Sequence, residues 1–240
     1  MLDYVLTGFA NNARNRIKCS WFLDETEYKQ LLTSILNNNK LYWICLTYSH
    51  LDTDSYTQLA GALLNNTNLK GIKLSYMAVG DLYAKEFAKI LSVNNNLVSL
   101  DLSHNRIGDL GAVEIANSLL VNTGLTSLDL SDNSIWDLGV SALANAIIHN
   151  TSLTIVKLWN INMFGVDVKE LVHALFKNTS IIKFELNCKY NSIIQTYLTR
   201  NKNYIKYRSN MCIFNNNSGL PDELNNLLTV ECQNYATFCG

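Results

Sequence analysis

Proline is nearly absent from this chain of 240 residues, which contains one proline and 11 glycines. Barrels and sandwiches of short antiparallel strands need many such turn residues, so the composition disfavours them. Charged residues are sparse, at 16%, whereas hydrophobic residues reach 48%, which excludes a disordered chain. With 19 basic and 20 acidic residues the formal charge is −1, so the chain as a whole does not favour nucleic acid or an anionic membrane as a partner.

Long hydrophobic runs are missing as well. No stretch approaches the roughly 18 apolar residues of a membrane span, and the first ten residues lack the basic start and apolar run of a signal peptide. The six cysteines show no C-x-x-C pair and no matched spacing, which disfavours a zinc site or a disulfide framework. We therefore expect reduced thiols and a cytoplasmic location, or export into a host cytosol without a cleavable signal.

Motifs that would indicate catalysis are also lacking. The sequence has no phosphate-binding glycine loop, no G-x-S-x-G and no H-E-x-x-H. Its four histidines are scattered, so they are not expected to converge on a metal. Cys45 and His50 could meet, but no third group is placed to orient them. We expect neither an enzyme, nor a metal site, nor a cofactor.

What is present is a repeat of 28 residues. Apolar residues recur at positions 1, 4 and 6 of each unit, as at Leu97, Leu100 and Leu102, and predict a strand with one buried face. Positions 19, 20 and 23 share one helical stripe, so each unit is a strand, a loop and a helix. The first positions of the units are Leu41, Leu69, Leu97, Leu125, Leu153 and Ile181.

Residues 97–107 and 125–135 carry the pattern L-x-x-L-x-L-x-x-N-x-I. This pattern resembles the leucine-rich-repeat family, specifically its ribonuclease-inhibitor-like class with 28-residue repeats. The resemblance implies an α/β solenoid, a horseshoe arc with parallel strands on the concave face and helices on the convex face. The family's asparagine at position 9 is kept as Asn105 and Asn133, whereas Ser49, Met77 and Ile161 replace it elsewhere and predict less regular turns.

Position 26 is asparagine in every full repeat: Asn66, Asn94, Asn122, Asn150 and Asn178. Asparagine tolerates the left-handed conformation that commonly ends a helix, and its amide can satisfy free carbonyls. We therefore expect each of these asparagines to cap a helix at its C-terminus in that conformation.

The chain divides into three parts. Residues 1–40 are expected to form an N-terminal capping repeat, in which residues 17–19 replace a proper strand. Residues 41–187 hold five repeats and the strand of a sixth. Residues 188–240 are expected to form a helical cap and a tail, with an inward-facing helix over residues 191–208.

The outward strand positions 3, 5, 7 and 8 make the candidate binding surface. Asp101 and Asp129 are expected on neighbouring strands roughly 4.8 Å apart, where like charges repel by about 1 kcal/mol even in water. A basic partner would relieve this repulsion; alternatively, the flanking Lys73 and Lys157 offset it. The predicted contact residues are Trp43, Tyr48, Lys73, Tyr76, Asp101, His104, Arg106, Asp129, Asp132, Lys157, Trp159 and Glu185.

Exposed aromatic residues bracket that acidic centre and are typical interface anchors. Trp159 is the better candidate, since Trp43 is equally compatible with burial against the N-terminal cap. Trp136 lies in a loop and is expected in the core. Residues 189–208 mix five basic residues with four tyrosines; the solvated face of an end cap is favoured there over a site for RNA or lipid.

These observations predict a monomeric, non-catalytic scaffold that binds a protein partner on its concave face. The resemblance adds an alternative, because the family includes the Ran GTPase-activating protein, and Arg106 is the only arginine in the five full repeats. Residues 220–224 (Leu-Pro-Asp-Glu-Leu) resemble the start of an F-box, an adaptor for ubiquitin ligases. The composition, rich in Asn, Ile and Lys, also suggests a bacterial effector acting in a host cell.

Overall fold

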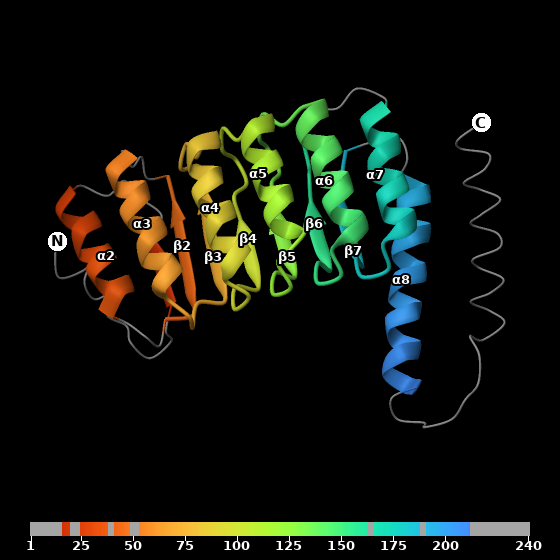
Figure 1. Ribbon diagram of the computed structural model, residues 1–240, viewed down its shortest axis with the longest axis horizontal. Helices are drawn as coiled ribbons and strands as arrows, with labels where there is room; N and C mark the ends of the chain where they lie inside the picture. The colour runs from red at the N-terminus through yellow and green to blue at the C-terminus, as the bar shows by residue number, and fades with distance from the viewer. Residues whose placement is uncertain are drawn as a thin grey trace.

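Strands and helices alternate throughout the computed structural model, which describes residues 16–19, 25–37, 41–48, 53–162, 166–187 and 191–211. Seven parallel strands form one sheet in chain order, and seven helices of the described part of the chain accompany them, most in a row along one side (Figure 1). The strands are β1 (Arg16–Cys19), β2 (Trp43–Thr47), β3 (Gly71–Ser75), β4 (Ser99–Asp101), β5 (Ser127–Asp129), β6 (Ile155–Lys157) and β7 (Lys183–Glu185). The helices are α2 (Glu25–Asn37), α3 (Thr53–Asn65), α4 (Asp81–Val93), α5 (Asp109–Leu119), α6 (Asp137–His149), α7 (Val166–Lys177) and α8 (Asn191–Met211).

The strands pair at the period seen in the sequence. Residues 28 apart face each other from β2 to β7, as Trp43 faces Gly71 and Asp101 faces Asp129. Residues 17–19 were expected to replace a proper strand, and this expectation is wrong, because residues 16–19 form β1 and pair in parallel with β2. Ile17 supplies the buried inward residue there, although the spacing from Arg16 to its partner Trp43 is one residue shorter than the repeat.

Among the described residues, helices cover only one face of the sheet, and this explains the alternation in each strand. Ile72, Leu100, Leu128 and Val156 pair in register and are fully buried toward the helices, whereas their neighbours on both sides point to the other face. A parallel sheet covered on both faces would instead have near-continuous apolar strands. Since strands lie about 4.8 Å apart and packed helices about 10 Å apart, the strands must line the inside of the curve.

Each of two helices begins on a carboxylate that the preceding repeat supplies. The Oδ1 atom of Asp81 accepts hydrogen bonds from the N–H groups of Gly108 (2.7 Å) and Gly111 (3.0 Å) at the start of α5. Asp109 does the same for Trp136 and Gly139 at the start of α6, at 2.8 Å and 2.9 Å. The N-cap residues Gly108 and Trp136 make no side-chain cap themselves, so the neighbour's aspartate satisfies these helix ends.

The asparagines at position 26 stabilise the ends of the units by way of their side chains. The Oδ1 atom of Asn150 accepts from the N–H groups of Ser152 and Leu153, and its Nδ2 donates to the carbonyls of Leu119 and Asn122 in the preceding repeat. The expected left-handed conformation is wrong, because Asn94 and Asn150 have φ values of −99° and −78°. At Asn150 the amide makes its contacts with the previous repeat's carbonyls from this extended backbone.

Helix α8 closes the solenoid by imitating that contact. Ile194, Tyr197 and Leu198 face inward and are buried, as expected for a cap. The buried Arg200 donates to the carbonyls of Leu175 (3.0 Å), Phe176 (2.8 Å) and Asn178 (2.7 Å), and Asn201 donates to those of Asn178 and Ile181. A cation at the end of α7 is also favoured by the helix dipole. One basic residue of segment 189–208 therefore has a structural role.

Candidate partner-binding surface

Polar side chains cover the exposed face of the sheet in pairs that lie across neighbouring strands. At position 5, Lys73 pairs with Asp101, and the Nζ atom of Lys157 lies 3.1 Å from Asp129 Oδ2. The two carboxylates therefore turn to different lysines, and the lysines offset the charge of the acidic centre. This is the alternative that was left open from the sequence, and the surface holds no unpaired acidic patch at Asp101 and Asp129.

The ionisation of these groups follows from the pairing. Burial disfavours the charged form of Asp101, but hydrogen bonds from Lys73 and Ser103 outweigh it and hold the pKa of Asp101 below its ordinary value. Burial likewise opposes the charge of Lys157, yet the hydrogen bond to Asp129 raises the pKa of Lys157. At the last strand, Lys183 lies 2.8 Å from Glu185 and lowers the pKa of this more exposed carboxylate.

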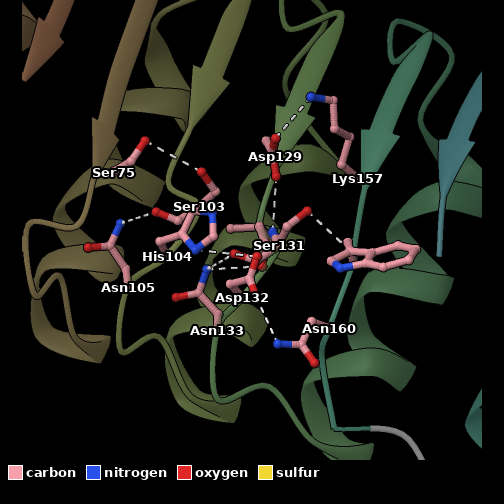
Figure 2. A network of polar contacts seen from close by, with 12 residues as sticks. Ser75, Ser103, His104, Asn105, Asp129, Ser131, Asp132, Asn133, Lys157 and Asn160 are labelled. Atoms are coloured by element: carbon pink, nitrogen blue, oxygen red, sulfur yellow. Dashed lines mark hydrogen bonds and ion pairs between the residues drawn. The ribbon is translucent and has the colours of Figure 1, made fainter. Parts of the chain in front are cut away.

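Small hydroxyl groups form the floor between the aromatic residues. Ser75, Ser103 and Ser131 stand at position 7 of successive strands and are nearly buried (Figure 2). The Oγ of Ser103 lies 2.6 Å from Asp101 Oδ1 and 3.4 Å from Ser75 Oγ. These bonds hold the carboxylate that pairs with Lys73, so the polar groups of Ser103 and Asp101 already have partners.

Position 8 carries a row of side chains along the ends of the strands, and its backbone is left-handed in every repeat. The φ values lie between 54° and 62°. The rings of Tyr48 and Tyr76 stack with centroids 4.6 Å apart, and those of Tyr76 and His104 stack at 4.3 Å. We call Tyr48, Tyr76 and His104 the aromatic row. Tyr48 is 59% exposed and Tyr76 is 45% exposed.

Beyond the aromatic row, the position 8 side chains of the next two repeats make polar contacts. The Nδ1 of His104 lies 3.4 Å from Asp132 Oδ2, and the Nδ2 of Asn160 donates to Asp132 Oδ1 at 2.8 Å (Figure 2). Five consecutive repeats thus present position 8 in the order Tyr48, Tyr76, His104, Asp132 and Asn160. The first three of these five side chains form the aromatic row, and the last two, Asp132 and Asn160, are polar.

The tryptophans differ in their surroundings. Trp159 follows β6 and is 49% exposed, with its backbone N–H on the Oγ of Ser131 at 3.2 Å. Trp43 is half-buried, and its ring lies over Gly71 in the next strand, where no Cβ would fit. Trp136 was expected in the core, and this expectation is wrong: it is the exposed N-cap of α6 and stands where Gly80 and Gly108 precede α4 and α5.

Arg106 lies in the loop between β4 and α5, two residues after His104, and is exposed. Its backbone N–H donates to the carbonyl of Val79 at 2.9 Å. Within the described ranges its guanidinium group makes no hydrogen bond or ion pair with another side chain. The loop therefore presents a free cation at the same end of the strands as the aromatic row.

Three of the sequence hypotheses concern residues outside the described part of the chain: the less regular turn at Ser49, the meeting of His50 with Cys45, and the F-box-like residues 220–224. Cys45 itself is a buried free thiol, and burial raises its pKa. No three His, Cys, Asp or Glu residues among those described are grouped to hold a metal ion. None of the described helices combines the length and the hydrophobicity of a transmembrane span.

The left-handed backbone of position 8 is the feature that sequence reasoning missed. Three of its five residues, His104, Asp132 and Asn160, belong to the types most often found in that conformation. Their recurrence at one repeat position was a usable signal. The stacking of Tyr48 on Tyr76 followed from their 28-residue spacing once position 8 was known to point away from the core.

Comparisons with known proteins agree with this fold. The Leucine Rich repeat family model matches residues 93–116 and 121–144. No curated protein matches the sequence. Among solved structures, the chain is similar to leiomodin-1 actin-binding site 2, with 19% identity and a TM-score of 0.52 over 77% of this chain and 94% of that one.

Two further structures are more distant. The tropomodulin C-terminal domain of Caenorhabditis elegans has 12% identity and a TM-score of 0.48, over 76% of this chain and 97% of that one. An internalin from Listeria monocytogenes has 16% identity and a TM-score of 0.40, over 76% and 64%. The strand register from β2 to β7, the asparagines at position 26 and the two matched repeats together show a leucine-rich-repeat fold, an α/β solenoid.

Proposed function

We propose that the protein is a non-catalytic scaffold that binds another protein on the exposed face of its sheet, with the aromatic row and Trp159 as the main contacts. The observation that carries this proposal is the backbone of Tyr48 and Tyr76. Both residues are left-handed, at φ of 62° and 57°, and both rings are exposed.

The fold does not need tyrosine at these two positions. The left-handed conformation costs an ordinary L-residue about 1–2 kcal/mol, and His104, Asp132 and Asn160 show that polar types suited to it are accepted in the same turn. Stacking of the rings returns about 0.5–1.5 kcal/mol at most. The tyrosines therefore bring little net stability while exposing apolar surface, as expected of residues kept for contact with a partner.

The polar floor supports a neutral mode of recognition. Lys73 with Asp101 and Lys157 with Asp129 are already paired, and Asp132 is held by His104 and Asn160. Carboxylates used in this way are poorly placed to act as acids or bases, which favours a scaffold over an enzyme. The proposal consequently relies on aromatic contacts and no longer on an unpaired acidic centre.

The test is a pull-down in which the double variant Tyr48→Asn/Tyr76→Asn is compared with the wild type. Asparagine suits the left-handed backbone, so the variant should stay folded and lose its partner. A protein retained by the wild type and by Leu120→Ser, but lost with the double variant and with Trp159→Ala, would support the proposal. Retention of the same proteins by all variants would refute it.

Comparing lysates from different sources shows in which cell the partner occurs. We propose a cytosolic partner, since Cys45 is a buried free thiol. A eukaryotic cytosol and a bacterial lysate are used as separate arms, and retention from the eukaryotic arm alone would favour the effector hypothesis. Purified actin is a third arm, because the leiomodin-1 fragment of similar fold is named as an actin-binding site.

A second candidate function is activation of a GTPase by Arg106. The favouring observation is its exposed guanidinium, for which the described residues provide no partner. An arginine supplied in this way stabilises charge in the transition state and accelerates hydrolysis about 10³- to 10⁵-fold. GTP hydrolysis by a panel of small GTPases should show no acceleration if the protein is a scaffold, whereas acceleration that Arg106→Ala abolishes would establish the second function.

A further inference from the structure

A second exposed apolar surface lies on the helix layer, away from the sheet face. Leu82, Leu110 and Leu138 are each the second residue of their helix, in α4, α5 and α6, and are 60%, 69% and 60% exposed. We call these three residues the leucine row. The exposed Trp136 directly precedes the last of these helices.

The fold gives no reason for leucine at these positions. Helix α3 carries Asp54 at the equivalent position, also exposed, so an acidic residue is accepted there. Single exposed leucines are common on protein surfaces. Three at one repeat position in adjoining helices, next to an exposed tryptophan, form a row of exposed apolar side chains of the kind that marks an interaction site.

The charge at these helix starts is mainly negative, with Arg106 in the loop before α5 as a basic exception. The first turns of α3, α4, α5 and α6 contain four carboxylates, from Asp54, Asp81, Asp109 and Asp137, and their first four residues contain no basic side chain. The N-terminus of each helix carries about half a positive charge, which offsets about half of this negative charge. The leucine row is therefore apolar with an acidic border, and it is complementary to a partner that is apolar and basic.

The spacing of the row points to the shape of that partner. Helices α4, α5 and α6 stand side by side (Figure 1), and packed helices are separated by about 8–10 Å. An α-helix that repeats an apolar residue every seven positions presents one about every 10.5 Å. One such helix, laid across the starts of α4 to α6, would place one apolar side chain against each leucine.

We propose that the leucine row and Trp136 bind a basic amphipathic α-helix of another protein, which lies across the first turns of α4, α5 and α6. This surface lies on the helix layer, whereas the aromatic row lies on the exposed face of the sheet. The proposal is independent of the function proposed for the aromatic row, and either one stands if the other fails.

The test measures binding of the full chain to a labelled peptide of three heptads, with leucine at every seventh residue and lysine at the flanking positions. Fluorescence anisotropy at physiological salt gives the affinity. We expect binding that Leu110→Asp weakens about tenfold or more. A peptide in which glutamate replaces the lysines should also bind about tenfold or more weakly, because the acidic border repels it.

The variants have precedents within the chain, so loss of folding is not expected to confuse the result. Leu110→Asp reproduces the residue type that Asp54 provides in α3, where an acid in the first turn is favourable. The control Leu120→Ser removes another exposed leucine and reproduces Ser92 of the preceding repeat. This control and the double variant Tyr48→Asn/Tyr76→Asn should both bind the peptide as the wild type does.

Three outcomes would overturn the proposal. The first is no binding of the lysine peptide, and the second is equal binding by wild type and Leu110→Asp. The third is a wild-type dimer in gel filtration that Leu110→Asp converts to a monomer, because a second copy of the chain would then be the occupant of the leucine row.

Discussion

The turn after β3 and the turn after β4 occupy the same positions of the repeat but are stabilised by different side chains. In the later turn, the amide of Asn105 donates to the carbonyls of Leu74, Leu102 and Ser103. In the earlier turn the equivalent residue is the buried Met77, which offers no such donor. The comparison teaches that a repeat need not supply the side chain that stabilises its own turn, because a neighbouring repeat can supply it.

The turn after β3 is stabilised from both sides. Asn105 accepts hydrogen bonds on Oδ1 from the N–H groups of Met77 and Val79, both at 3.0 Å, and Tyr56 of the preceding unit donates its hydroxyl to the carbonyl of Met77. This turn still differs from the others, since Ala78 adds a second left-handed residue, at φ 56°. The expectation of a less regular turn at Met77 is therefore confirmed in its backbone.

The largest expected effect comes from removing the shared amide. Asn105→Ala leaves several buried carbonyl and N–H groups of two repeats without partners, and each unsatisfied group costs about 1–3 kcal/mol. We expect the free energy of unfolding in urea to fall by about 3 kcal/mol or more.

The matched control is Asn117→Ala on the exposed face of α5, which should change stability by no more than about 0.5 kcal/mol. If Asn105→Ala were equally mild, the turn after β3 would not depend on its neighbour, and the comparison above would fail.

A pair of glycines in α3 and α5 gives a second comparison, this time of helix packing. A Cβ at Gly111 in α5 would lie 2.8 Å from the Cβ of Ala84 and 2.9 Å from Ile107 Cγ2, whereas a Cβ at Gly61 in α3 would meet nothing within 4 Å. We expect Gly111→Ala to destabilise the protein by about 2 kcal/mol. Gly61→Ala should instead stabilise it by about 0.5–1 kcal/mol. Thermal unfolding of both variants tests this difference. Melting temperatures that shift in the same direction from the wild type would contradict it.

A smaller effect is expected from the hydroxyl that supports the Met77 turn. The Tyr56 side chain is buried, and burial raises the pKa of its phenol, which therefore stays protonated and donates to Met77. Tyr56→Phe keeps the ring stacked on Tyr83 and removes one hydrogen bond. The free energy of unfolding should fall by about 1 kcal/mol. No change in a urea titration would show that Asn105 alone holds this turn.

The smallest effect concerns acid stability. The pKa of Asp101 is lowered in the folded state from its ordinary 3.8, so its contribution to stability is complete above that value and is lost as the pH falls through the folded pKa. Asp101→Asn should flatten the loss of stability below about pH 4. Glu185→Gln, at a more exposed pair, should flatten it less. Parallel acid curves for Asp101→Asn and the wild type would contradict the assignment.

Most of the fold was predictable from the 28-residue period, because the period fixes which residues face inward and which strands pair. Leu100 and Leu128 had to be buried once position 4 was assigned to the inner face, and they are. The pairing of Asp101 with Lys73 was less accessible, since repulsion and pairing at a 4.8 Å spacing both follow from the same ladder until side-chain directions are known. Trp136 was misjudged because its size suggested burial, whereas its place as an N-cap keeps it outside.

Several asparagine amides reach back along the chain to the preceding repeat. Asn105, Asn122 and Asn150 donate to carbonyls of the repeat before them, and Arg200 with Asn201 does so at the end. On the ribosome, a newly made unit therefore lacks its full set of donors until its successor has emerged from the exit tunnel. The hydrogen bonds between units therefore form one unit later than the chain is synthesised. Those of the last unit form only when α8 has been synthesised.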